Sequence, residues 1–158
     1  MNTQTASSLT IAGLNTSMAK GCIFCKIVNG DEKAWKIYED EFCLAFLDVF
    51  PVTEGHVLII TKEHVVDVFD LGEKAFMDLF KVSRKISMVM KKGLDAEFVN
   101  IITAPGVIKH AFIHIVPRYS HDLMGPVPDM ENKRKMDDDN MKKLSDKLRR
   151  VLDVKGKA

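Results

Sequence analysis

The residues with the clearest chemical potential lie in one short segment near residue 110. His110 and His114 flank Phe112 in a run that also contains β-branched apolar residues, which favour a strand. Because side chains alternate between the faces of a strand, His110, Phe112 and His114 are predicted to project from one face. Two imidazoles in register can serve in chemistry, or they can be hydrogen-bonded residues of an ordinary strand. Residue types alone leave both interpretations open.

Cys22 and Cys25 form a second chemically active pattern. A Cys-x-x-Cys pair can turn two thiolates toward one ion and is the usual half of a structural zinc site. It can also be a redox pair, but a thioredoxin-like motif would lie at a strand–helix junction, and here the turn-rich residues 28–31 follow. Two reduced, packed thiols are the remaining interpretation. With three cysteines in all, the sequence favours a reducing, cytoplasmic compartment over a disulfide framework.

Apolar patterning predicts the elements that must position these residues. Runs rich in β-branched and aromatic residues predict five strands, at 35–40, 42–48, 56–60, 98–103 and 110–118. Helical spacing predicts a short helix at 64–71, a long helix at 73–92 ended by Gly93, and an amphipathic C-terminal helix at 137–154. The predicted fold class is therefore α+β, a five-stranded antiparallel sheet with one long helix and a C-terminal helix.

The composition excludes several classes of partner. Lys and Arg number 23 against 22 Asp and Glu, so no net field favours nucleic acid or an acidic membrane. No apolar run approaches the roughly 20 residues of a membrane span. Residues 1–17 carry no charge and are rich in Ser, Thr and Asn, which predicts a disordered leader over residues 1–20. That stretch lacks the basic start and apolar core of a signal peptide.

The segment at 110–118 also carries a family resemblance. Its pattern, His-φ-x-φ-His-φ-φ-Pro-Arg, resembles the His-φ-His-φ-His-φ-φ signature of the histidine triad (HIT) proteins. A second match lies upstream, in Phe46-Leu47-Asp48, Gly55-His56 and Lys62-Glu63-His64, with Thr61 where relatives usually have Pro. The resemblance implies a HIT-like domain at 21–122, followed by an extension at 123–158 whose helix packs on the domain or on a dimer partner. HIT proteins are commonly homodimers whose sheets join across a two-fold axis.

The resemblance also implies roles for individual residues. In relatives with this Cys-x-x-Cys, zinc is held by the two Cys, a His after the third strand and the first His of the triad. The matching positions are Cys22, Cys25, His64 and His110. Asp48 would accept hydrogen bonds from ribose hydroxyls, the alternative being a turn or helix cap. The nucleotide-binding set implied is Phe24, Ile27, Phe46, Asp48, Asn100, His110 and His114, and plain core packing is the alternative for its aromatic members.

Two departures from the family bear on the chemistry. The middle His of the triad is the family's nucleophile, and Phe112 stands there without a lone pair to attack phosphorus. Relatives also have a longer loop before the triad, with a Gly-Gln or Gly-Ser element that holds the phosphate. Here the loop at 104–109 has no Gln or Ser, and Pro105 lacks an amide donor. Fewer donors would mean weaker phosphate binding and less stabilisation of a transition state.

Three hypotheses follow from the motifs and the departures. The first is a HIT-family protein that binds a nucleoside monophosphate or related phosphate ester and lacks the family's histidyl chemistry. The second is a nucleotide hydrolase in which His114 acts as general base toward water, with Arg118 or His121 assisting. The third is a zinc-stabilised dimeric interaction domain. An engineered knock-out of an active parent would also place Phe at 112, but one substitution would not shorten the loop as well.

Overall fold

The structure is a computed structural model that describes residues 21–104 and 106–155, so the predicted leader lies outside the described residues. Its elements are α1 (Ile23–Asn29), β1 (Lys36–Glu39), β2 (Cys43–Leu47), β3 (Val57–Thr61), the 3-10 turn η1 (Val68–Asp70), α2 (Glu73–Gly93), β4 (Phe98–Ile102), β5 (Phe112–Arg118) and α3 (Asp138–Lys155). The strands form one sheet in the order β1-β2-β3-β5-β4, and every neighbouring pair is antiparallel. The predicted fold class is confirmed.

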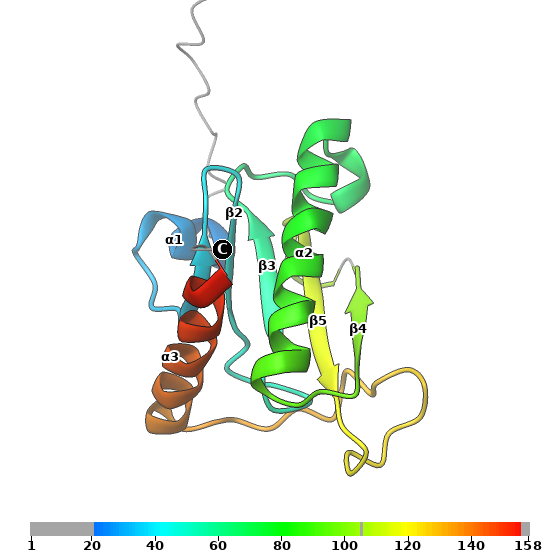
Figure 1. The fold of residues 1–158 in the computed structure, drawn as a ribbon. Coiled ribbons are helices and arrows are strands. Elements are labelled where there is room, and N and C mark those ends of the chain that lie inside the picture. The colour runs from blue at the N-terminus through cyan, green and yellow to red at the C-terminus, as the bar shows by residue number, and fades with distance from the viewer. Residues whose placement is uncertain (1–20, 105, 156–158) are drawn as a thin grey trace, which may run out of the picture.

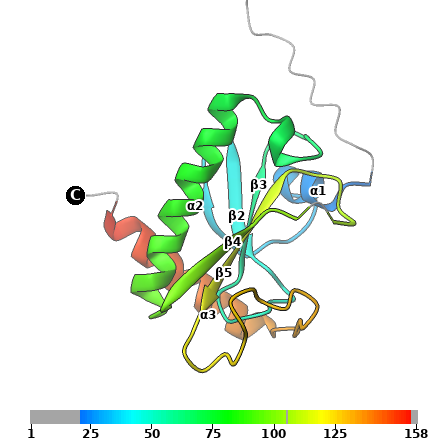
Figure 2. The same cartoon turned by 90° about the vertical axis from the view of Figure 1, so that its right-hand side faces the viewer.

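The helices cover the sheet unequally. The long helix α2 contacts β3, β4 and β5, while α3 packs beside it on β1 and β2. Figures 1 and 2 show these two helices on one face of the sheet and the short α1 on the opposite face. Among the described residues, no helix combines the length and apolar character that crossing a bilayer requires.

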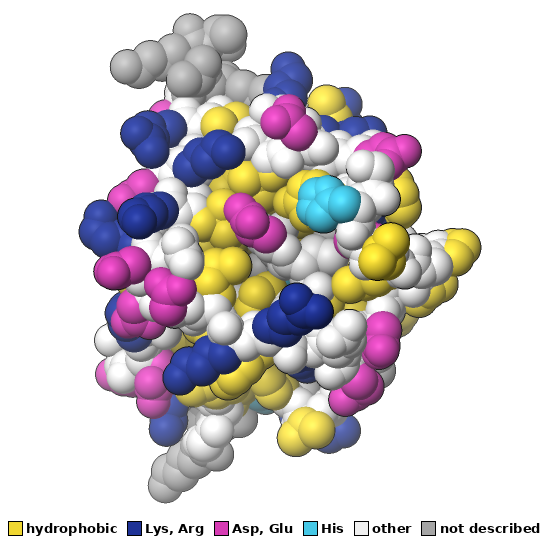
Figure 3. All heavy atoms as spheres, turned by 90° about the horizontal axis from the view of Figure 1, so that it is seen from below, with side chains coloured by type: hydrophobic (Ala, Val, Ile, Leu, Met, Phe, Trp, Pro, Cys, Tyr) yellow, Lys and Arg dark blue, Asp and Glu magenta, His cyan; other side chains and the backbone are white. Residues whose placement is uncertain are grey.

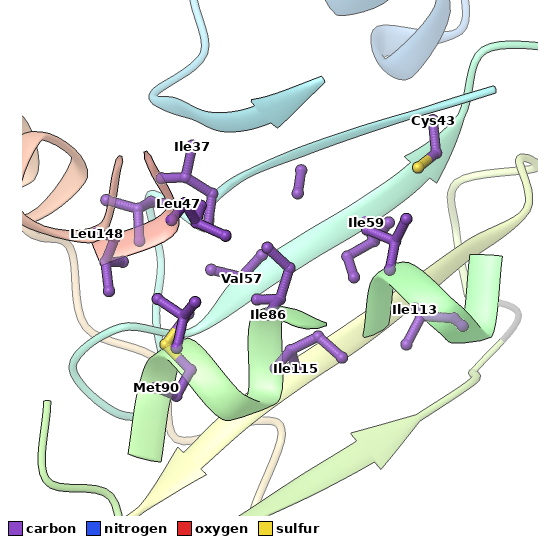
Figure 4. Packing of buried hydrophobic residues seen from close by; sticks show 14 of the residues in the cluster. Ile37, Cys43, Leu47, Val57, Ile59, Ile86, Met90, Ile113, Ile115 and Leu148 are labelled. Carbon is purple, nitrogen blue, oxygen red and sulfur yellow. The ribbon is translucent and has the colours of Figure 1, made fainter. Parts of the chain in front are cut away.

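The main core lies between the sheet and the α2–α3 layer. Ile113 and Ile115 of β5 point into it, together with Val57 and Ile59 of β3, as Figure 4 shows. The apolar stripe predicted for the C-terminal helix is buried in the same cluster through Met141, Leu144, Leu148 and Leu152. The extension therefore packs on its own domain through α3.

A smaller apolar cluster lies on the α1 face of the sheet. Because the strands alternate, Phe112 of β5 and Leu58 of β3 leave the opposite side from the main core. They pack against α1 in a cluster made of Phe24, Ile27, Leu44, Phe46, Leu58, Ile60 and Phe112. The two-residue period of the strands thus separates a structural core from the face that carries the candidate site.

Three local predictions were wrong. The residues after Cys22 form the helix α1 up to Asn29, and the turn begins only at Gly30, whose φ is 83°. The helix predicted at 64–71 is reduced to the single turn η1, capped by the side chain of Asp67. Gly93 is the last residue of α2 instead of its terminator, and Leu94 is the C-cap. Each error concerns an element end or a short segment, where local propensity is weak and tertiary packing decides.

Gly55 holds the turn that delivers His56 to β3, and its replacement should be costly. Its φ is +84°, and a Cβ built there would overlap Leu94 Cδ1. Gly30 has nearly the same φ, +83°, but open space around it. We expect Gly30→Ala to lower the free energy of unfolding by about 1 kcal/mol through backbone strain, and Gly55→Ala to lower it by more. Urea denaturation of both variants measures the difference; equal losses would contradict the close packing at Gly55.

Candidate functional site

Four potential metal ligands converge where α1 meets the sheet. Cys22 Sγ lies 3.5 Å from His110 Nδ1, and Cys25 Sγ lies 3.2 Å from His64 Nδ1. Cys25 Sγ is also 3.7 Å from His110 Nδ1, and the two Nδ1 atoms are 3.2 Å apart. These residues come from the start of α1, the segment after β3 and the residue two before β5. Residues 88 positions apart in the chain are thus brought into contact.

The spacing of these atoms fits a tetrahedral zinc site. Zinc–sulfur bonds of about 2.3 Å and zinc–nitrogen bonds of about 2.0–2.1 Å place the ligand atoms of a tetrahedron roughly 3.3–3.8 Å apart. The separations of 3.2 to 3.7 Å in this cluster are close to that range. His110 Nε2 donates to the carbonyl of Thr61 at 2.8 Å, which leaves the lone pair of Nδ1 facing the thiols. The donor set could therefore hold zinc.

A second group of polar residues lies on the same face, away from the cysteines. His56 Nε2 is 3.0 Å from His114 Nδ1, and Asp48 Oδ2 is 3.6 Å from His56 Nδ1. One donor atom from each of the three lies within 4.8 Å of the others, as a metal would require. His56, however, faces Asp48 with Nδ1 and His114 with Nε2. The three side chains therefore form a linear chain instead of surrounding one point. His56 itself is fully buried.

The hydrogen bonds around His56 favour one tautomer of this chain. The amide of Val52 donates to His56 Nδ1 at 3.4 Å, whereas the carboxylate contact at 3.6 Å is longer than a hydrogen bond. With Nδ1 accepting, the proton lies on His56 Nε2 and is donated to His114 Nδ1. His114 then carries its own proton on Nε2. In this tautomer His114 is a hydrogen-bond donor toward a ligand instead of a base.

Burial keeps both imidazoles neutral at physiological pH. The pKa of His56 is lowered to about 3, mainly by burial and to a lesser extent by the neighbouring His114 and Lys133. Burial also lowers the pKa of His114 to about 4, again with a contribution from Lys133. Burial raises the pKa of Asp48, while the Phe50 amide and Lys133 act in the opposite direction. Asp48 Oδ1 accepts from that amide at 2.9 Å, as a turn-forming Asp does.

Phe112 occupies the centre of the row that begins with His110 and ends with His114. Its ring centroid lies 5.2 Å from Phe24 and 4.9 Å from His114, with edge-to-face geometry in both pairs. The residues predicted to line a base slot, Phe24, Ile27 and Phe46, are buried in the same cluster. The structure thus brings them together, packed against one another and against Phe112.

Two polar residues singled out in the sequence are engaged elsewhere. Arg118 is 1% exposed, and its guanidinium donates to both carboxylate oxygens of Asp122 at 2.8 and 3.0 Å. Asn100 accepts from Arg118 Nη1 at 3.0 Å and donates to the carbonyl of Pro126 at 3.3 Å. His121 is exposed and stacks on Tyr119. Arg118 and Asn100 therefore hold the segment that follows β5.

The comparisons with known proteins place this geometry in a family. The HIT domain model matches residues 29–121, more than half of the chain. The chain belongs to the HIT family. An uncharacterised HIT-like protein of Borreliella burgdorferi is 38% identical over 66% of this chain and 80% of its own length. The adenosine 5′-monophosphoramidase hnt1 of Schizosaccharomyces pombe is 36% identical over 61% of this chain and 74% of its own.

A solved structure supports the same assignment. The crystal structure of a zinc-bound histidine triad family protein from Mycobacterium smegmatis matches with a TM-score of 0.73 and 31% sequence identity. The match covers 87% of this chain and 97% of that one. The HIT fold of this chain, with a Cys and His cluster that could bind a metal, thus has a zinc-bound relative.

Sequence reasoning missed two residues of the site. His56 belongs to the Gly-His motif and begins the strand predicted at 56–60, but it was given no role. Strand alternation places it on the same face as Leu58, which pairs with His114. Strand alternation could therefore have found it. Lys133 lies in a stretch of mixed charge at 129–135, and no local signal connects that stretch to Asp48. Its electrostatic effect on the site depends on a chain path that only the structure reveals.

The partly buried His114 should make stability fall in acid. Its pKa is about 4 in the folded chain, against roughly 6.5 when unfolded, so the unfolded state binds a proton first as pH falls. Between about pH 6.5 and 4 each such proton lowers the free energy of unfolding by about 1.4 kcal/mol per pH unit. We expect His114→Asn to flatten this slope in urea denaturation. His121→Asn, which removes a surface imidazole, is the control; identical slopes in both variants would contradict a neutral, partly buried His114.

Proposed function

We propose that this HIT-family chain binds a nucleoside monophosphate, or a related phosphate ester, without forming the family's histidyl–nucleotide intermediate. The observation that carries the proposal is the position of Phe112, between His110 and His114 in the row that resembles the triad. A phenyl ring cannot take up a nucleotidyl group, because it has no lone pair. The relative hnt1 is an adenosine 5′-monophosphoramidase, so AMP is the moiety with which we would probe this chain.

The remaining polar groups suit binding better than bond cleavage. The favoured tautomer leaves His114 with an N–H that can donate to a phosphate oxygen. Asp48, with one oxygen in a turn and the side chain 13% exposed, supplies an acceptor for ribose hydroxyls. For the base we propose the cluster of Phe24, Ile27 and Phe46 beneath α1, with His110 at its zinc-facing end. Asn100, bonded to Arg118, would act by holding the neighbouring segment.

The alternative function is hydrolysis through His114 as general base. The observation that favours it is the chain from Asp48 through His56 to His114. If Asp48 accepted a hydrogen bond from the Nδ1–H of His56, then His56 Nε2 would accept one from the Nδ1–H of His114. His114 Nε2 would then have a free lone pair and could take a proton from water. The longer Asp48–His56 contact makes this tautomer the less favourable one, so we rank hydrolysis second.

We also propose a structural zinc ion, held by Cys22, Cys25, His64 and His110. Zinc would fasten α1, and with it Phe24, to the sheet. With one nitrogen on the metal and the other donating to Thr61, His110 would have no proton to exchange with a ligand. We also propose a homodimer, because β4 is an edge strand that leaves Phe98 and Ile101 more than 40% exposed. A cytoplasmic location is consistent with reduced thiols.

Removal of a cysteine from the proposed zinc site should lower zinc binding, whereas removal of a cysteine outside it should not. We expect Cys25→Ala to bind less than one zinc per chain and to have a lower melting temperature, because a tetrahedral site with three protein ligands holds its ion less tightly. Cys43→Ala is the matched control, since this third cysteine is buried in the main core away from the cluster. Metal analysis of the purified chains measures the stoichiometry. Zinc retained by Cys25→Ala would exclude the proposed site.

Binding and chemistry should separate in this chain. Calorimetric titration with AMP should show binding, while adenosine 5′-phosphoramidate should not be turned over. Phe112→His should introduce turnover, because it supplies a nucleophilic imidazole beside His114. Phe112→Leu, which changes the ring without adding a nitrogen, should remain inactive. Turnover by the unmodified chain would favour the hydrolase alternative, and absence of AMP binding would favour an interaction domain.

A further inference from the structure

The segment that follows β5 crosses the lower end of the sheet as a strap, which we define as residues 122–137. Its first end is held by the buried guanidinium of Arg118. Besides the ion pair with Asp122, Arg118 Nη2 donates to the carbonyls of Met124 at 3.2 Å and Gly125 at 2.9 Å. The amide of Asn100 donates to the next carbonyl, that of Pro126. The strap therefore leaves β5 along a fixed path.

The second end of the strap is bonded to the turn that contains Asp48. The amide of Arg134 donates to the carbonyl of Pro51 at 3.1 Å, and the amide of Met136 donates to that of Val49 at 3.4 Å. The intervening Phe50 amide is the one that donates to Asp48 Oδ1. Lys133, the residue before Arg134, is thereby held next to the turn. Figure 2 shows the strap, in orange, at the lower end of the sheet.

The side chains of the strap divide between two sides. Asn132, Arg134 and Lys135 line a cleft of about 890 Å³. Figure 3 shows the underside of the molecule, where apolar surface lies between charged side chains. Lys133 is not among the lining residues. Its charge instead lowers the pKa of Asp48, His56 and His114 together. Lys133 is exposed and forms no ion pair within the described part of the chain.

We propose that Lys133 is the cation that binds the phosphate of a nucleoside monophosphate at this site. This inference rests on the proposed function and names the group that recognises the charge. The neighbouring imidazoles are neutral and Asp48 is an acid, and Lys133 is the cation whose charge acts on all three of these residues. An ammonium on a flexible stem binds phosphate as a point charge. It would compensate for the donors that the loop at 104–109 lacks.

Titration of the full-length chain with AMP and with adenosine isolates this role. Lys133→Gln should weaken AMP binding about tenfold and reduce its salt dependence, because one charge-assisted hydrogen bond to phosphate is removed. Adenosine has no phosphate, so its affinity should not change. Lys135→Gln is the matched control, since this lysine lies in the same strap but lines the cleft. It should bind both compounds as the unmodified chain does.

These titrations distinguish failure of the proposed role of Lys133 from failure of the proposed function. If the unmodified chain binds AMP and Lys133→Gln binds it equally well, the role of Lys133 is overturned while the proposed function stands. An equal loss of AMP and adenosine binding in Lys133→Gln would also overturn it, because the residue would then act on the shape of the site. If the unmodified chain binds neither compound, the proposed function and this inference fall together.

Discussion

The two-residue period of β5 is the constraint on which this molecule depends. Ile113 and Ile115 leave the strand toward α2 and fill the main core, while Phe112 and His114 leave it toward α1. A shift by one residue would bury the imidazole in the core and expose an isoleucine at the site, so the packing energy of the core fixes the register. The pairing of Leu58 with His114 extends the same constraint to β3 and brings His56 alongside. Stability and site geometry are set by the same strand.

The sheet and the two long helices could be predicted from the sequence because each has many residues with one consistent period. The elements that failed are short. In α1, seven residues carry too few turns for a helical pattern, and the helix is held by Phe24, Cys25 and Ile27 packing on the sheet. Around Val68 only one turn forms, because a side-chain cap and nearby packing decide the conformation. Local sequence does not contain these tertiary contributions.

The candidate site divides along similar lines. Cys22, Cys25, His64 and His110 were found through motifs, and the structure brings their donor atoms together. The family resemblance predicts that Asp48 binds ribose, and a role in a turn is the alternative. One of its carboxylate oxygens does accept a hydrogen bond from the Phe50 amide within a turn. Asn100 was predicted for nucleotide binding, yet its amide bonds the strap and Arg118. Lys133 could not be predicted as a site residue from the sequence. Backbone hydrogen bonds between two segments that are far apart in the chain bring it near Asp48.

The way in which the strap is fastened has an evolutionary consequence. From Met124 to Met136, its bonds to Arg118, Asn100, Pro51 and Val49 are made by its own carbonyls and amides. None of these bonds uses the side chain of Lys133, so its substitution would leave them in place. Residue 133 could therefore carry a charged, polar or apolar side chain while its backbone stays beside the turn of Asp48. The fold thus offers natural selection a position at which ligand preference can diverge between homologues without a penalty in folding.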